Sequence, residues 1–413
     1  MSRTPALSAL ALLLAVMAMT AGAASALAAD SPHSDSESPT VDGSPADVTV
    51  ISNATNYLAV GTPDRQTYAH SDVDVTAAAG MSAERLKRSH ADRVFDREFQ
   101  SADGDRLSLV RDRVGSAEDR LDRLDARYDT LLDAYSNGSL SRETFLRRVA
   151  QLSAETTSVE GHLQHVATRV DESPGTSLSV TLSTRISDLQ TEQITLPDPV
   201  RQRVQAGLAG RDGSPIVYVG ATGDSLVLAT VDGEEFTRTA TVRDAYAPDQ
   251  PDEFEEAEGR SVVLALRRGG DLYPWAYDNA IGTPQVRGFG NTAVYLVRVE
   301  HPQGSLETYL SGGTRDAFHE TQILRAGEVP VTATTSAPTD SLNVTVETTS
   351  PTGPMRVSLV QPSTGAPLDG AVRVNGEEVG RTGDDGELYT VQPAGQFRVN
   401  ATTGANSAAV SVS

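Results

Sequence analysis

Residues 105–170 read DRLSLVRDRVGSAEDRLDRLDARYDTLLDAYSNGSLSRETFLRRVAQLSAETTSVEGHLQHVATRV. In the first half, the side chains spaced alternately three and four apart are Leu107, Val110, Val114, Ala117, Leu121, Leu124, Tyr128, Leu131 and Tyr135. In the second half they are Phe145, Val149, Leu152, Thr156, Val159, Leu163, Val166 and Val170. This spacing keeps the side chains on one helical face and is the heptad pattern of coiled coils. The stretch therefore predicts coiled-coil helices over 105–135 and 141–170.

The segment between these helices carries turn and capping signals. Gly138 can adopt the left-handed conformation that ends a helix. Ser141 is a suitable N-cap, and Leu140 and Phe145 occupy the two positions of a hydrophobic staple. We expect an antiparallel helical hairpin over 81–172, with arms about 40 Å long at about 1.5 Å per residue. A shorter helix, Met81 to Gln100, is expected at its base.

After Pro174 the pattern changes to short alternating segments, such as Leu178–Leu182. A weak internal repeat follows, in which 217–219, 225–228 and 233–236 parallel 294–296, 305–308 and 314–318. A helical candidate precedes each set, at 200–208 and at 254–266. The repeat predicts an α+β domain over 176–325, built from a helix and a three-stranded meander twice.

The turn Gly-Gly-Thr-Arg-Asp-Ala-Phe at 312–318, together with the helix-then-meander plan, resembles the small exported PepSY domain. That domain accompanies some proteases and cell-surface proteins. The resemblance implies a regulatory part for the middle of the chain.

From Val329 onward, short apolar runs alternate with Pro, Gly, Asn and Asp at the spacing expected of a β-sandwich. Residues 364–377 and 382–389 contain an Asn375-Gly376 hairpin signal and a Thr-x-Asp-x-Gly turn. They resemble carboxypeptidase regulatory-like and invasin-type modules. The resemblance implies a non-catalytic sandwich over 327–413, so the fold class expected for the chain is multidomain α+β.

The first residues carry an export signal. Arg3 is the only charge before an uncharged run that ends in Ala24-Ser25-Ala26-Leu27-Ala28-Ala29, which a signal peptidase would cut. Residues 1–29 are therefore expected to be a signal peptide, although an uncut segment of this length could instead anchor the chain in a membrane. The Ser-, Asp- and Pro-rich residues 30–47 predict a disordered linker, and 48–80 a short β or irregular lead-in.

The charge balance indicates a protein that works in an extracellular medium of high salt concentration. The 413-residue chain carries a formal charge of −22, contains no cysteine, and has Lys87 as its single lysine. Molar salt shortens the Debye length to about 3 Å and screens such acidic self-repulsion. We therefore expect a halophilic protein without disulfides, and the lack of a basic stripe in this acidic background argues against nucleic acid as a partner.

The candidate sites are sparse. Four glycosylation sequons occur, at Asn53, Asn137, Asn343 and Asn400. His162 and His165 are spaced to share a metal ion, but they are better interpreted as solvated residues beside the heptad seam. Residues 288–293 fit G-x-G-x-x-A, yet they precede a predicted strand and not a helix, which argues against a dinucleotide site.

Three further clusters have structural explanations. The carboxylates that could hold calcium, or mark a solvated helix start, are Asp249, Asp252, Glu253, Glu255, Glu256 and Glu258. The aromatic group Tyr273, Trp275 and Tyr277 is expected in the core, with a partner-binding patch as the alternative. Asp384-Asp385-Gly386 is expected to be chiefly a turn, with calcium binding as the minor alternative. No catalytic, cofactor-binding or metal-binding residue is predicted.

The segments 55–60 and 135–141 are similar to exported haloarchaeal proteins. Together these features predict a secreted or cell-surface, non-enzymatic modular protein that acts as a spacer or interaction protein. The expected partner is another protein or a component of the cell surface, with membrane contact only if residues 1–29 stay attached. The alternative is an exported, PepSY-like regulator of a protease or another hydrolase, and an unrecognised hydrolase is least favoured because no nucleophile and base can be assembled.

Overall fold

The computed structural model describes residues 48–102, 104–255, 260–290 and 292–413. The predicted signal peptide and linker lie outside these ranges. Within them, no helix combines the length and the apolar character needed to cross a membrane.

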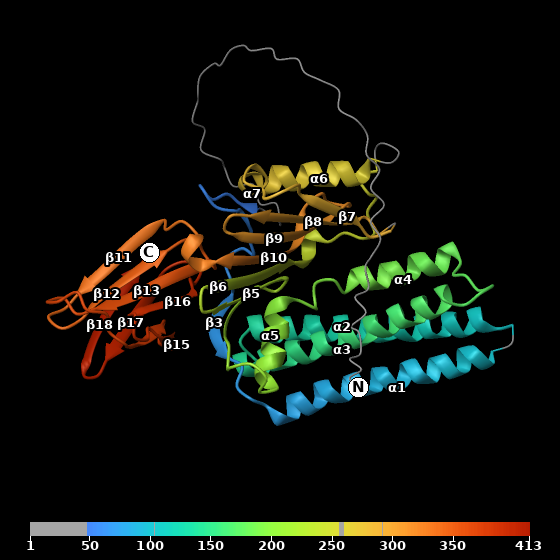
Figure 1. The fold of residues 1–413 in the computed structure, drawn as a ribbon, viewed down its shortest axis with the longest axis horizontal. Helices are drawn as coiled ribbons and strands as arrows, with labels where there is room; N and C mark the ends of the chain where they lie inside the picture. The colour runs from blue at the N-terminus through green and yellow to red at the C-terminus, as the bar shows by residue number, and fades with distance from the viewer. Residues whose placement is uncertain (1–47, 103, 256–259, 291) are drawn as a thin grey trace, which may run out of the picture. The chain divides into compact units, whose positions relative to one another are not determined.

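An eight-stranded antiparallel sheet forms the centre of the described chain (Figure 1). Its strands, in spatial order, are β3 (Arg65–His70), β4 (Ile216–Ala221), β5 (Ser225–Asp232), β6 (Glu235–Val242), β10 (Ala317–Arg325), β9 (Gly304–Ser311), β8 (Val294–His301) and β7 (Gln285–Gly288). The two predicted meanders, β4–β6 and β8–β10, meet where β6 pairs antiparallel with β10. The sequence did not predict the edge strand β7, and it placed β3 in the lead-in outside the α+β domain.

Five helices lie on one side of this sheet. Those that contact its strands at β3 to β5 are α2 (Arg106–Ser136), α3 (Arg142–Asp171) and α5 (Pro199–Leu208), and those that pack against these helices are α1 (Val75–Ser101) and α4 (Val180–Glu192). Helices α6 (Ser261–Leu272) and α7 (Pro274–Asp278) cover the other face, at β7 to β9. Figure 1 shows the two groups on opposite sides of the strands. The predicted duplication of a helix and a three-stranded meander therefore holds for the strands only. The two helices that precede the meanders, α5 and α6, pack on opposite faces of the sheet and are not equivalent. Helix α6 also begins at Ser261, seven residues later than expected.

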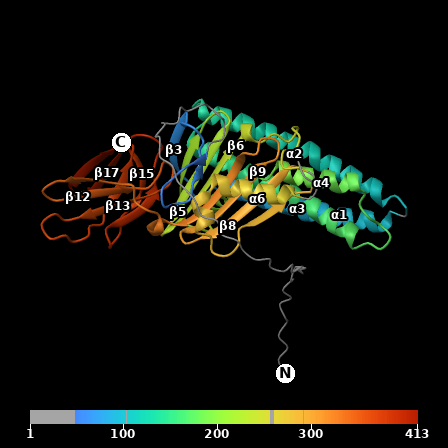
Figure 2. The same cartoon turned by 90° about the horizontal axis from the view of Figure 1, so that it is seen from above.

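The heptad seam residues after Leu107 are buried, including Leu124 and Thr156 at 1% and 0% exposure, and Leu107 is partly buried. Helix α3 packs against both α1 and α2, and also against α5. Figure 2 shows α1 to α4 running side by side. The two long helices are therefore members of a larger helical layer. The helix expected over 81–100 is the longer α1, which runs along α3 with Leu86 exposed.

Residues 180–182, expected in a strand, begin helix α4. Ser179 Oγ accepts a hydrogen bond from the Leu182 backbone N–H, which is the geometry of an N-cap. Leu182, Ile186 and Leu189 follow at intervals of four and three and are buried. The strand prediction was wrong because a five-residue window cannot distinguish helical from strand periodicity.

The C-terminal residues form a β-sandwich, as the sequence predicts. One sheet contains β11 (Ala333–Pro338), β12 (Asn343–Thr348), β13 (Pro354–Val360) and β16 (Glu387–Val391). The other contains β15 (Glu377–Arg381), β14 (Ala371–Val374), β17 (Phe397–Thr403) and β18 (Asn406–Val412). Asn375 and Gly376 have φ angles of 51° and 89°, so they form the predicted hairpin turn. A small pair, β1 (Val48–Thr49) and β2 (Tyr57–Leu58), precedes β3.

Candidate functional site

A buried ion pair lies where the central sheet meets the sandwich. Arg238 projects from β6 and Glu320 from the neighbouring β10, and Arg238 Nη1 lies 2.7 Å from Glu320 Oε1. The two side chains are 3% and 0% exposed. Both sit on the face of the sheet that also carries Phe236 and Leu324, because alternate residues of a strand point to the same side.

Groups from distant segments complete this pair. Glu320 Oε2 accepts hydrogen bonds from the Leu58 backbone N–H at 2.7 Å and from the Tyr273 hydroxyl at 2.8 Å. Arg238 Nη2 donates to the Leu58 carbonyl at 2.8 Å, and Arg238 Nε donates to Thr352 Oγ1 at 3.0 Å. Burial raises the pKa of Glu320, and the Arg238 guanidinium beside it opposes that shift. We call these five residues the junction network.

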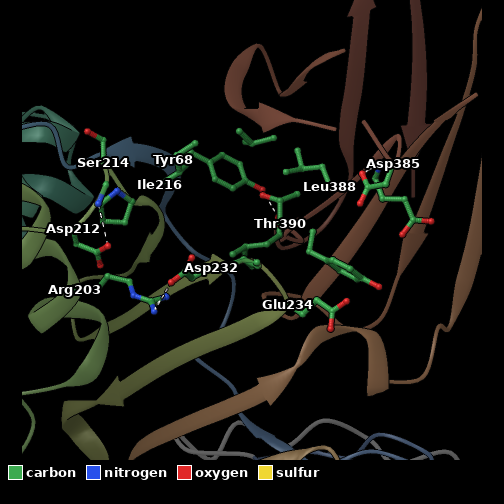
Figure 3. A pocket seen from close by; sticks show the side chains of 18 residues that line it. Tyr68, Arg203, Asp212, Ser214, Ile216, Asp232, Glu234, Asp385, Leu388 and Thr390 are labelled. Atoms are coloured by element: carbon green, nitrogen blue, oxygen red, sulfur yellow. Dashed lines mark hydrogen bonds and ion pairs between the residues drawn. The ribbon is translucent and has the colours of Figure 1, made fainter. Parts of the chain in front are cut away.

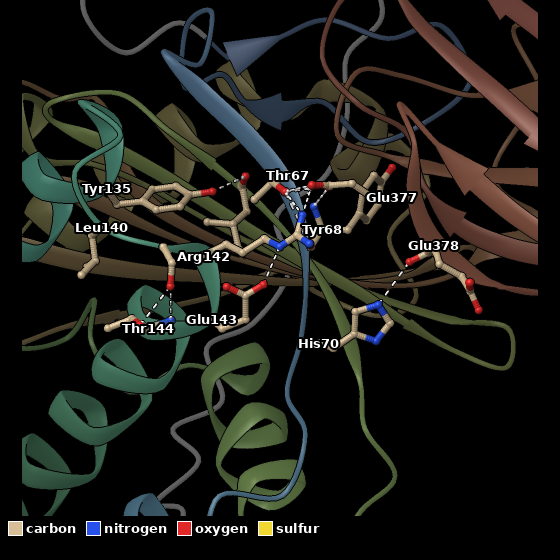
Figure 4. A network of polar contacts seen from close by, with 12 residues as sticks. Thr67, Tyr68, His70, Tyr135, Leu140, Arg142, Glu143, Thr144, Glu377 and Glu378 are labelled. Atoms are coloured by element: carbon tan, nitrogen blue, oxygen red, sulfur yellow. Dashed lines mark hydrogen bonds and ion pairs between the residues drawn. The ribbon is translucent and has the colours of Figure 1, made fainter.

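A second polar cluster joins β3 to the sandwich near the start of α3 (Figure 4). The Glu377 carboxylate of β15 accepts from Thr67 Oγ1 at 2.6 Å and from the Tyr68 backbone N–H at 2.7 Å. Arg142 pairs with the same carboxylate and donates to Thr67 Oγ1 at 3.0 Å. The Tyr68 hydroxyl donates to the Val391 carbonyl of β16. The edge strand β3 is therefore covered by the sandwich, which satisfies groups that an edge would leave open.

A cleft of about 500 Å³ opens beside this cluster (Figure 3). Figure 3 shows Asp212 and Asp232 on the side of the central sheet and Asp385 on the side of the sandwich. Arg203, the one basic residue in the lining, lies 3.0 Å from Asp232. Ser214 is present, but no histidine lines the cleft. The lining can attract cations and accept hydrogen bonds, and it contains no serine–histidine pair for nucleophilic chemistry.

The four sequon asparagines are not brought together. Asn53 and Asn137 are exposed, in a loop and at the turn between α2 and α3. Asn343 and Asn400 lie in sandwich strands and are half-buried. Glycosylation stays a prediction at all four, with the first two the more accessible.

The sequence suggested that His162 and His165 are solvated residues beside the heptad seam, and the structure shows that this interpretation is wrong. His162 Nδ1 lies 2.6 Å from Asp92 Oδ1, and His165 Nε2 lies 3.0 Å from Asp96 Oδ1, so both bind carboxylates of α1. Heptad positions in α3 could not reveal this, because they do not show which helix packs alongside. Across the described ranges, no group of three or more His, Cys, Asp or Glu is arranged to hold a metal ion.

The remaining clusters have structural positions. The described residues of the acidic cluster precede α6 and do not start it, since α6 begins at Ser261. Within that cluster, the Asp252 carboxylate accepts from the Phe254 backbone N–H and from the Tyr295 hydroxyl, while Glu256 and Glu258 lie outside the described residues. Gly288 ends β7, and β8 follows after a short loop, so the glycine motif does not open a helix.

The aromatic group belongs to the core. Tyr273 is fully buried, and Trp275 and Tyr277 pack against the same cluster. The Tyr273 hydroxyl is part of the junction network. This role could not be predicted from local patterns, because the partner carboxylate, Glu320, comes from a strand 47 residues further along the chain.

Residues 1–213, a little over half of the chain, match the family described as Domain of unknown function (DUF7096). The chain belongs to the DUF7096 family. Residues 217–330 match the Family of unknown function (DUF7094), and residues 333–410 match the archaeal fibronectin-III type-like domain. A search of curated proteins found no match. The PepSY domain is not among the matched families, so that resemblance stays a prediction.

These matches define a modular protein in which two of the matched regions contribute strands to the same sheet. The DUF7096 region supplies helices α1 to α5 and strand β3, whereas the DUF7094 region supplies the other seven strands of the same sheet. The junction network takes Leu58 from the DUF7096 region and Arg238, Tyr273 and Glu320 from the DUF7094 region. Thr352 comes from the fibronectin-type domain. All three matched regions therefore meet at one buried ion pair.

Proposed function

We propose that the chain is an exported, non-enzymatic protein of a halophile that works outside the cell as a rigid spacer and interaction module. The observation that carries this proposal is the junction network, which binds the three matched regions to one another. A protein made of independent domains joined by flexible linkers would not need buried polar contacts between those domains.

The energetics of the network support rigidity. Breaking a buried ion pair by removing one partner costs about 3–5 kcal/mol, because the other charge is left uncompensated. The apolar core supports the same conclusion, since one cluster contains Val227 and Phe236 of the sheet together with Val391 of the sandwich. Relative motion of the sandwich would have to break both kinds of contact.

The external location rests on the sequence. The apolar run after Arg3 and the alanine-rich residues that follow it support export. The charge of −22 and the single Lys87 support a surrounding of molar salt.

The mature N-terminus tests the proposal. When the full chain is expressed in a halophilic host, we expect it in the external or surface fraction, beginning near Asp30, as read by N-terminal sequencing. A Leu13→Arg variant, which puts a charge into the apolar run, should remain inside the cell. Wild-type protein found inside with residues 3–20 intact would contradict export, and external protein that keeps those residues would show anchoring in place of cleavage.

A further inference from the structure

The glycosylation sequon between α2 and α3 differs from the other three in how much of it reaches the surface. Asn137, Gly138 and Ser139 are all exposed. The middle residues of the other three sequons are buried, and they are Ala54, Val344 and Ala401. A glycosyltransferase must hold the asparagine amide and the hydroxyl two residues later at the same time, so the whole segment has to be accessible. In the folded chain, only the sequon at Asn137 meets this condition.

Tertiary contacts close the other three sequons. Thr55, the hydroxyl residue of the sequon at Asn53, is 3% exposed, and its Oγ1 donates to the Asn56 carbonyl. Asn343 lies in β12 between β11 and β13, and Asn400 lies in β17 between β14 and β18. A transferase could engage either strand only after the ladder hydrogen bonds on both of its sides were broken. These three asparagines are therefore poor acceptors once the chain has folded.

The turn that carries Asn137 is held at both ends. Arg65 of β3 donates to the carbonyls of Tyr135 and Leu140, at 3.1 and 2.6 Å, and these two residues flank the turn. Figure 4 shows Tyr135 and Leu140 beside the start of α3. The exposed sequon therefore has a defined position in the folded protein.

The reactive atom of Asn137 has no partner in the described structure. Asn137 Oδ1 accepts a hydrogen bond from the Ser139 backbone N–H at 3.0 Å. No hydrogen bond among the described residues uses the other side-chain atom, the amide nitrogen Nδ2. Glycosylation takes place at that nitrogen, so no contact of the side chain would have to be broken for it to react.

We propose that Asn137 is the N-glycosylation site of the folded protein and that the other three sequons stay unmodified. An oligosaccharyltransferase supplies the glycan from a lipid-linked phosphate donor. The bond between the anomeric carbon and the phosphate oxygen breaks, and its electron pair leaves with the lipid phosphate. A carbon–nitrogen bond forms to Nδ2, which loses one proton. This inference rests on the export proposed above, because a sequon is an acceptor only in an exported chain.

Mass spectrometry of the chain, expressed in a halophilic host whose external proteins carry N-glycans, tests the site. We expect the external protein to carry one glycan, on the peptide that contains Asn137. Asn137→Gln and Ser139→Ala should each lose the glycan mass completely. Ser139→Thr should keep it, because threonine supplies the same hydroxyl.

The matched control is Ser136→Ala, which removes a hydroxyl just before the sequon and should leave the glycan in place. External protein without a glycan at Asn137, or with one at Asn53, Asn343 or Asn400, would overturn this proposal and leave export standing. Equal loss of the glycan in Ser136→Ala and Ser139→Ala would also overturn it. Unmodified wild-type protein found only inside the cell would contradict export, and this proposal with it.

Discussion

Arg238 and Glu320 carry full charges inside an apolar core, where each ion loses several kcal/mol of hydration. The loss is offset by their mutual attraction and by the hydrogen bonds from Leu58, Tyr273 and Thr352. An ion pair of this kind adds little net stability over an apolar core of the same shape. The ion pair instead specifies which segments pack together, because each donor and acceptor must come from one particular segment.

His319 provides a pH prediction at the residue scale. Burial, with Arg201 adding to it, lowers the pKa of His319 to about 3, and its Nδ1 lies 2.9 Å from Thr241 Oγ1. In the unfolded chain the residue titrates near pH 6.5. Because the folded pKa is the lower one, the stability contribution is present above pH 6.5 and is lost as the pH falls toward 3. The loss from this residue is about 1.4 kcal/mol per pH unit.

Denaturant unfolding in molar KCl at pH 6, 5 and 4 measures this effect. His319→Gln keeps a hydrogen-bonding group beside Thr241 and removes the titration, so its free energy of unfolding should fall less steeply than that of the wild type. His301, whose pKa burial lowers to about 4, remains in both proteins and leaves a residual slope. Parallel slopes for the two proteins would show that His319 does not titrate as described.

At the scale of elements, helix α2 offers the sharpest prediction. Leu124 is 1% exposed, whereas Arg123 beside it is exposed. Leu124→Asp places an unpaired carboxylate among apolar neighbours and should lower the free energy of unfolding by about 3 kcal/mol or more. Arg123→Asp should cost well under about 1 kcal/mol, as exposed charges do. Thermal unfolding of both variants in molar salt makes the comparison, and equal losses would mean that the buried face of α2 is assigned wrongly.

Much of the fold is predictable from local patterns. The heptad spacing locates α2 and α3, the Ser141 cap marks where α3 begins, and the Asn375-Gly376 pair marks a hairpin. The first two strands of each meander are also found, because their alternation is local, whereas the segments predicted for the third strands, 233–236 and 314–318, overlap β6 and β10 by only two residues each. Edge strand β3 is missed because its residues, Arg65–His70, are mostly polar and pair with β4, which begins 146 positions after β3 ends.

The candidate sites are less predictable, for the same physical reason. Arg238 and Glu320 are 82 positions apart, and only the pairing of β6 with β10 brings them together. A charged residue within a buried strand is a signal available in the sequence, but it does not name its partner. The faces on which α5 and α6 pack likewise depend on tertiary contacts.

At the scale of the whole molecule, the boundaries of the matched families do not coincide with separate folded bodies. The DUF7096 region ends at residue 213, just before β4, yet its β3 completes the sheet of the DUF7094 region. Residues 44–413 form one compact unit. We therefore expect the three matched regions to fold and unfold together.

Scanning calorimetry of the mature chain in molar KCl tests that claim most directly. We predict a single transition whose calorimetric and van 't Hoff enthalpies agree, as a cooperative unit requires. Arg238→Met should separate the sandwich transition from that of the sheet, whereas Arg373→Met, at an exposed ion pair of the sandwich, should leave one transition. Two resolved transitions in the wild-type protein, one of them reproduced by residues 327–413 alone, would contradict the account.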